Sequence, residues 1–320
     1  MRAYIIRRFL FLIPTLILVT ILVFMSVRFI PGNVVEVMAA QMSMQSAGGQ
    51  PITSDYLRRV LGLDQPIHVQ YWKWVTEAAR GDLGDSLWTH RPITQELVAK
   101  LPVSVELGLW ALVTSLIIAL PIGIYSAIRQ DTLGDYAGRT IAILFISLPG
   151  FWLATITVVY PSIWWGWSPP LSYVHFGNDP VGNIIQFAIP GTIMGASFAG
   201  GTMRLVRTMM LEVLRQDYIR TAWAKGLSER VVIMRHALKN TMLPIVTVIG
   251  MSLPMLVAGA VIFEQIFSLP GVGMYLLDAV GKRDYPIICG INLVVATAVL
   301  LCNVGVDLVY GYLDPRVQYQ

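Results

Sequence analysis

Three acidic residues lie inside or beside long apolar stretches of the sequence: Glu106, Glu264 and Asp307. The interior of a bilayer penalises charge, so an acidic residue retained there is a candidate functional group. All three lie close to the ends of their stretches, where water or a neighbouring arginine is the commoner partner. The sequence leaves both roles open for each of them.

The residues that could catalyse a reaction or bind a metal do not occur at the spacings that such sites require. A phosphate-binding loop ends in Gly-Lys followed by Ser or Thr, whereas Gly281 and Lys282 are followed by Arg283. Cys289 and Cys302 fall in one apolar stretch, and on a helix they would lie about 20 Å apart, too far for a disulfide. The four histidines have no ligand spacing: His68, His90, His175 and His236. We therefore expect no catalytic residues, no metal site and no ATP hydrolysis in this chain.

The elements that carry these residues are predicted from composition. The 320 residues are 55% hydrophobic and only 13% charged, whereas soluble domains are about a quarter charged. The net charge of +4 is small and the basic residues form no tract, which argues against nucleic-acid binding. The simplest explanation for the missing charge is a membrane.

Apolar stretches recur along the chain at lengths that suit a bilayer. A helix needs about 20 mostly apolar residues to cross it, and the backbone must be helical because lipid offers no hydrogen-bond partner. Six stretches qualify: Phe9–Ile30, Val103–Ile128, Ile141–Trp164, Ile184–Met203, Ile245–Phe267 and Ile287–Val309. The predicted fold class is an all-α integral membrane protein with six transmembrane helices.

The first apolar stretch could be a signal peptide, because Arg2, Arg7 and Arg8 precede it. The apolar part of a signal peptide is about 7–15 residues long, and this stretch has about 22. We therefore predict a retained helix.

The fourth stretch is the least apolar, with Gly191, Gly195 and Ala199 at every fourth position. Small residues at this spacing form a smooth face for close helix packing. Ordinary helix packing and a helix that lines a polar path both agree with the pattern.

Lysine and arginine are unevenly distributed between the two sides of the predicted membrane. The segment 204–242 holds eight of them, whereas the short loops on the other side hold only Lys282 and Arg283. Short positive loops stay in the cytoplasm. Both termini are therefore predicted to be cytoplasmic, and the number of spans is even.

Residues 31–102 form a long polar region on the predicted outer side, with three tryptophans: Trp72, Trp74 and Trp88. A region of this length usually has structure of its own. It could be a folded cap on the bundle, a docking surface for an external delivery protein, or both.

The segment 213–242 is predicted to lie in the cytoplasm. Residues Leu211, Leu214, Tyr218, Ala222 and Lys225 follow helical steps of three and four. Gly226 then interrupts the pattern, and a second amphipathic piece follows over 229–237. Two short helices around a glycine could dock a partner, lie on anionic lipid, fix the topology or merely connect two spans.

At this segment the chain resembles a known family. The strings DYIRTAWAKGL (217–227) and HALKNTMLP (236–244) are similar to the cytoplasmic coupling motif of binding-protein-dependent ABC importer permeases. The resemblance is strongest to the first of the two permease subunits in dipeptide, oligopeptide and nickel importers. Other motifs follow in the order usual for that family: LGLDQPIHVQYWKWV from Leu61, GDLGDS from Gly81, ELGLWA from Glu106, EQIFSLPGVG from Glu264, KRDYP from Lys282 and VDLVYGYLDPRV from Val306.

The resemblance implies a fold, a location and partners. It implies the type I ABC importer permease fold in a bacterial or archaeal cytoplasmic membrane, with a second permease subunit, two cytoplasmic ATPase subunits that bind ATP and Mg, and an extracytoplasmic substrate-binding protein. The expected regions are 1–30 with the first helix, 31–102 outside, the permease core 103–312 with coupling segment 213–242, and the cytoplasmic tail 313–320. Peptides, nickel, glutathione and oligosaccharides are all substrates of such importers.

The resemblance also assigns residues to ATPase coupling: Tyr218, Ile219, Arg220, Thr221, Ala222, Ala224, Lys225, Gly226 and Leu227. Two positions depart from the family pattern. Trp223 stands where relatives usually carry a basic residue, which bears on the identity of the ATPase partner, and Asn33 stands where they usually carry aspartate. The competing function is a secondary transporter or channel that works alone, although the sequence has no clear inverted repeat.

Overall fold

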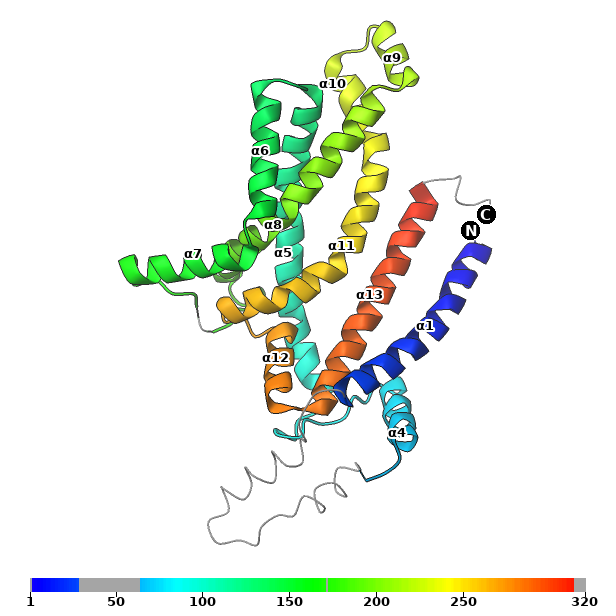
Figure 1. Cartoon of the computed structure of the whole chain (residues 1–320), viewed down its shortest axis with the longest axis vertical. Helices are drawn as coiled ribbons and strands as arrows, with labels where there is room; N and C mark the ends of the chain where they lie inside the picture. Colours follow the sequence, from blue (N-terminus) through cyan, green and yellow to red (C-terminus); the bar gives the residue numbers. More distant parts are fainter. Residues whose placement is uncertain (1, 29–63, 171, 314–320) are drawn as a thin grey trace. The chain divides into compact units, whose positions relative to one another are not determined.

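The structure is a computed structural model that describes residues 2–28, 64–170 and 172–313 (Figure 1). The described residues form helices and no named strand; only an isolated bridge joins Asp85 and Pro92. The predicted all-α class is confirmed. The elements are α1 (Arg2–Arg28), α4 (Ile67–Ala79), α5 (Ile93–Ile128), α6 (Leu133–Ser147), α7 (Gly150–Trp165), α8 (Pro180–Leu214), α9 (Asp217–Ala224), α10 (Glu229–Val231), the π-helix η1 (Val232–Ala237), α11 (Leu238–Ile266), α12 (Val272–Lys282) and α13 (Tyr285–Leu313).

Four described helices are long and apolar enough to cross a membrane. They comprise Leu10–Arg28 of α1, all of α5, all of α8 and Tyr285–Val306 of α13. The bent pair α6 and α7 would make a fifth. The predicted span 245–267 lies in α11 except for its last residue, and many side chains of this helix are outside the described set. A total of six spans therefore stays a prediction.

The predicted third span, 141–164, is wrong as a single helix. The chain forms α6 and α7 instead, which meet at 83° across Leu148 and Pro149. Leu148 is extended, with φ −85° and ψ 118°. Proline disfavours helical backbone at the residue before it and has no N–H to donate, so Pro149 ends one helix and begins the next.

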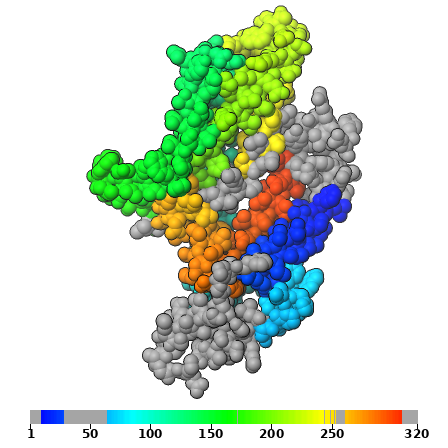
Figure 2. All heavy atoms as spheres, viewed as in Figure 1, coloured from blue at the N-terminus to red at the C-terminus, as the bar shows by residue number. Residues whose placement is uncertain are grey.

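The chain divides into two compact units. The first unit contains residues 102–274 and 299–320, together with 1–5. Within it, α8 packs against both α6 and α11. The short helices α9 and α10 lie at one end of these helices (Figure 1), and their atoms form a tip on the surface of the unit (Figure 2).

The small residues of α8 pack closely on α5. A Cβ atom on Gly191 would lie 2.6 Å from Trp110 Cβ, and one on Gly195 would lie 2.5 Å from the carbonyl oxygen of Ala111. Neither helix has room to retreat without opening the core, in which Phe187 and Met194 are fully or almost fully buried. The stripe of small residues thus packs two helices together.

The second unit contains residues 6–101 and 275–298. Phe24 of α1 packs against Tyr71 and Trp74 of α4, with ring centroids 5.4 and 5.6 Å apart. The loop after α4 is held by Ser86, whose hydroxyl donates to the buried carboxylate of Asp284 at 2.6 Å. The sequence motifs GDLGDS and KRDYP, 198 residues apart at these positions, therefore meet in the fold.

Candidate coupling surface

The segment after α8 turns sharply before it forms α9. Arg215 ends α8, and Gln216 is extended with φ −72° and ψ 149°. The helical pattern that the sequence showed from Leu211 onward is therefore divided between two helices, and the prediction of one amphipathic helix there is wrong. The turn allows α9 to fold back so that its own apolar side faces the bundle.

Two of the predicted coupling residues anchor α9. Ile219 is completely buried and Ala222 nearly so. They join a core cluster with Val206 and Met210 of α8 and Val232 of η1. Burial of such side chains contributes about 25 cal/mol per Å² of apolar surface, which holds the short helix in one place.

The remaining predicted coupling residues are exposed: Tyr218, Arg220, Thr221, Ala224, Lys225, Gly226 and Leu227. Large apolar side chains lie among them, with Tyr218 43%, Trp223 45% and Leu227 36% exposed. Met234 of η1 adds a further side chain that is 56% exposed. We call this set the coupling surface. Contiguous exposed apolar groups with a polar rim are typical of protein interaction sites.

Gly226 closes α9 with a specific backbone shape. Its φ is +75°, a region that glycine enters at little cost. The Gly226 N–H donates to the Trp223 carbonyl at 2.9 Å, and the Leu227 N–H donates to the Ala222 carbonyl at 3.4 Å. These two bonds form a Schellman motif, so the predicted glycine interruption is confirmed.

The second predicted amphipathic piece, 229–237, is helical but is no separate short helix. It runs through α10 and η1 directly into α11. The π-helix lies where Val232, Ile233 and Ala237 turn into the core. Asn240, one turn further on, donates to the Tyr218 hydroxyl at 2.8 Å and so connects α11 to the coupling surface.

A buried carboxylate supports the helices that carry this surface. Asp135 of α6 accepts two hydrogen bonds from Arg207 of α8, from Nε and Nη2, each at 2.8 Å. It also accepts from Ser126 of α5, and Arg139 Nη2 lies 3.1 Å away. Paired bonds between arginine and a carboxylate fix orientation as well as adding strength. Three helices are thereby joined at one point.

Sequence reasoning missed this cluster. In the sequence, Arg207 counts only among the positive charges of segment 204–242, and neither Asp135 nor Arg139 stands out. The local signal was the spacing of Asp135 and Arg139, which are four residues apart on one helix. The pairing with Arg207 spans 72 residues, and one sequence contains no signal for it.

Two of the three acidic residues singled out in the sequence have described side chains, and both accept hydrogen bonds from other protein groups. Glu264 is fully buried and accepts from the Ser104 hydroxyl at 2.6 Å and from the Met274 N–H at 2.8 Å. A Cβ on Gly271 would lie 2.2 Å from its carboxyl carbon, which explains the glycine in the LPGVG turn. These bonds give Glu264 a positioning role between α5, α11 and α12.

Glu106 accepts a hydrogen bond from Tyr173 at 3.2 Å. Burial, and secondarily the carboxylate of Glu106, raise the pKa of the Tyr173 hydroxyl, so Tyr173 keeps the proton that it donates. The side chain of Asp307 lies outside the described set.

Comparison with known proteins identifies the family. Residues 119–319 match the family described as binding-protein-dependent transport system inner membrane component, and residues 1–108 match the N-terminal region of such membrane components. The chain belongs to this family and is a membrane permease subunit, as its sequence motifs predicted.

Similar proteins cover the chain from end to end. The dipeptide transport system permease protein DppB of Alkalihalophilus pseudofirmus is 38% identical over 340 residues, with 100% of both chains covered. DppB of Escherichia coli K12 is 36% identical over 345 residues, again with 100% of both covered. A putative peptide transport system permease protein of Brucella abortus is 36% identical over 319 residues, also with 100% of both covered.

A solved structure shares the fold. A chain of the MetNI methionine ABC transporter, in an inward-facing form, matches with a TM-score of 0.54 and 18% identity, over 68% of this chain and 96% of that one. The expected type I ABC importer permease fold is confirmed.

Proposed function

We propose that this chain is a transmembrane permease subunit of an ATP-driven peptide importer, forms half of its translocation path, and docks a cytoplasmic ATPase subunit through the coupling surface. The observation that carries the docking proposal is the shape of α9. Its buried face fixes it to the bundle, while its other face presents Tyr218, Trp223 and Leu227 to the surroundings. A rigidly mounted apolar surface suits an interface better than it suits a loop.

The proposed partners follow from the family and from the chemistry that this chain lacks. A second permease subunit would complete the path, two ATPase subunits would bind ATP and Mg, and an extracytoplasmic binding protein would deliver the substrate. The relatives named as dipeptide permeases support short peptides as the substrate class. Both termini and the coupling surface would lie in the cytoplasm, as the distribution of Lys and Arg indicates.

Coupling would work by a shift between two states of the permease. ATP binding can bias the bundle only if the docked surface has different contacts in the two states. Movement of α9 would pass through the Ile219 and Ala222 anchor to α8 and η1. The pair of Asp135 and Arg207 would then carry it from α8 to α6.

Gly226→Val in the assembled importer tests the docking proposal. A Cβ added at Gly226 meets no atom within 4 Å, so the main cost should be backbone strain of roughly 1–2 kcal/mol, and α9 should be distorted without loss of the fold. We expect ATP-dependent peptide uptake and peptide-stimulated ATP hydrolysis both to fall at least about tenfold. A tenfold fall corresponds to a loss of about 1.4 kcal/mol in the free energy that stabilises the docked state.

Gly166→Val is the matched control. Gly166 ends α7 with φ +64° and also has no atom within 4 Å of an added Cβ, so its strain is comparable but it lies outside the coupling surface. Uptake by this variant should stay near the wild-type rate. Normal uptake and normal stimulated hydrolysis in Gly226→Val would refute the proposed role of α9.

A further inference from the structure

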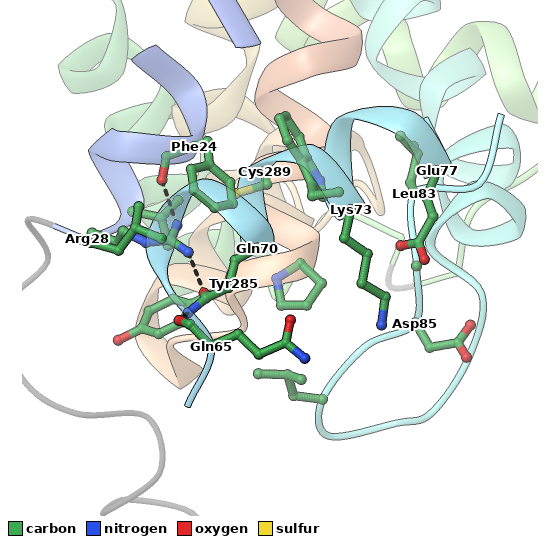
Figure 3. A pocket seen from close by; sticks show the side chains of 16 residues that line it. Phe24, Arg28, Gln65, Gln70, Lys73, Glu77, Leu83, Asp85, Tyr285 and Cys289 are labelled. Atoms are coloured by element: carbon green, nitrogen blue, oxygen red, sulfur yellow. Dashed lines mark hydrogen bonds between the residues drawn. The ribbon is translucent and has the colours of Figure 1, made fainter. Parts of the chain in front are cut away.

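The second unit contains a pocket that the coupling mechanism does not use. Its volume is about 550 Å³, within the range of about 300–1,000 Å³ for small-molecule sites. It lies between the end of α1, helix α4, the loop after α4 and the start of α13, and every residue that lines it belongs to this unit. It is shown in Figure 3.

The inner part of the pocket is apolar. Phe24, Val27, Leu83 and Cys289 line it, and each is at most 8% exposed. The indole N–H of Trp74 is also buried among the lining residues and has no hydrogen-bond partner in the part of the chain that the structure describes. A buried donor without a partner destabilises the fold, and a ligand with an acceptor would remove that cost.

The rim of the pocket carries charges of both signs. Figure 3 shows Arg28 and Gln70 on one side, Glu77 and Asp85 on the other, and the Lys73 side chain extending between them. The Arg28 guanidinium is already engaged, since it donates to Gln70 at 2.6 Å and to the Phe24 carbonyl at 2.9 Å.

Three rim charges are not engaged in this way. Lys73, Glu77 and Asp85 have no ion-pair or side-chain hydrogen-bond partner within the described ranges, although all three line the same pocket. Charged groups that converge on a pocket without pairing to each other are suited to a ligand that carries both signs.

We propose that this pocket binds a short zwitterionic peptide with an apolar side chain. Lys73 would pair with the carboxylate and Asp85 with the ammonium group. The apolar side chain would enter the inner part beside Phe24, and a peptide carbonyl would accept the Trp74 N–H. The pocket volume of about 550 Å³ suits a compact ligand. The choice of a peptide among zwitterions rests on the proposed function, whereas the need for both charges rests on the pocket alone.

Equilibrium binding to the full-length chain tests the proposal without any ATPase. The purified chain in phosphatidylcholine nanodiscs is titrated with radiolabelled Ala-Leu, with Ala-leucinamide, which lacks the carboxylate, and with N-acetyl-Ala-Leu, which lacks the ammonium group. We expect saturable binding of Ala-Leu to the wild type and binding at least about tenfold weaker to Lys73→Gln, as for loss of one charge-assisted bond.

Matching each variant to its analogue makes the test specific. Lys73→Gln should bind Ala-leucinamide as tightly as the wild type does, because this analogue has no carboxylate to pair with Lys73. Asp85→Asn should likewise bind N-acetyl-Ala-Leu as tightly as the wild type does, because this analogue has no ammonium group. Arg80→Gln is the control, because Arg80 is exposed at the end of the same helix but does not line the pocket; its affinity for Ala-Leu should be unchanged.

Three results would overturn the proposal. The first is equal affinity of the wild type, Lys73→Gln and Asp85→Asn for Ala-Leu. The second is no saturable binding to any of them. The third is a phospholipid retained by the wild type in native mass spectrometry, lost in Lys73→Gln and not displaced by Ala-Leu. Binding without ATP-driven uptake would refute only the proposed function, and uptake without binding would refute only the pocket.

Discussion

Two buried aspartates, one in each unit, hold distant segments together in different ways. Asp135 accepts hydrogen bonds from a serine hydroxyl and from two nitrogens of Arg207, and Arg139 Nη2 lies 3.1 Å from it. Asp284 is met by the Ser86 hydroxyl and the Leu87 N–H, and by no cation within the described ranges. The helices beneath the coupling surface are therefore joined by an ion pair, whereas the loop after α4 is held by hydrogen bonds from uncharged donors.

The largest effect should follow from removing the cation of the first cluster. Arg207→Met removes both guanidinium bonds of Asp135, which is fully buried, and leaves Arg139 as its nearest cation. Breaking a buried ion pair costs up to about 3–5 kcal/mol. We expect a large fall in the apparent melting temperature of the purified protein, measured by differential scanning fluorimetry.

Two further variants make this prediction specific to the pair. Arg204→Met removes an exposed arginine one turn earlier on α8 and should leave the melting temperature almost unchanged. Adding Asp135→Asn to Arg207→Met should restore part of the loss, because the buried carboxylate that lost the Arg207 bonds is then absent. A double variant less stable than Arg207→Met would show that the pair does not act as described.

A smaller effect is expected at the second aspartate. Asp284→Asn keeps one oxygen that can accept from the Ser86 hydroxyl and removes the other acceptor, so the loss should be about 1–3 kcal/mol. The same melting assay measures it, with Asp278→Asn on α12 as a control. If Asp284→Asn destabilises as strongly as Arg207→Met, an unseen charge partner would have to exist and the contrast between the two clusters would be wrong.

The smallest change in this series is Ser86→Ala. It removes a neutral hydroxyl that donates to Asp284 and accepts from the Thr89 N–H at 3.0 Å. A net cost of about 1 kcal/mol is typical for one hydrogen bond. The melting temperature should fall less than in Asp284→Asn, and a fall equal to that of Arg207→Met would contradict the ranking.

A feature of the fold could be predicted from the sequence where its signal lies within a few neighbouring residues. The stripe of Gly191 and Gly195 and the interruption at Gly226 are local patterns, and the fold uses them as predicted. The bend at Pro149 was hidden because hydropathy runs on across it, although the proline itself was a local warning. The turn at Gln216 had no such warning, since glutamine continues a helix as readily as it ends one.

The clusters themselves could not be predicted from one sequence. Ser86 and Asp284 each stand in a recognisable motif, but their contact spans 198 residues. Asp135 and Arg207 are joined only because α6 packs on α8. The exposed coupling residues were assigned through the family resemblance, whereas the anchoring roles of Ile219 and Ala222 became visible only from their burial.

Cysteine labelling tests the central claim, that α9 is a cytoplasmic docking surface, most directly. In a variant with Cys289 and Cys302 replaced by alanine, one cysteine is introduced at Ala224 or at Thr89, both exposed positions, and cells are treated with a membrane-impermeant maleimide. We predict that Thr89→Cys is labelled in intact cells. Ala224→Cys should be labelled only in inside-out vesicles, and less when the ATPase subunits are bound. Labelling of Ala224→Cys from outside intact cells, or labelling that bound ATPase leaves unchanged, would contradict the account.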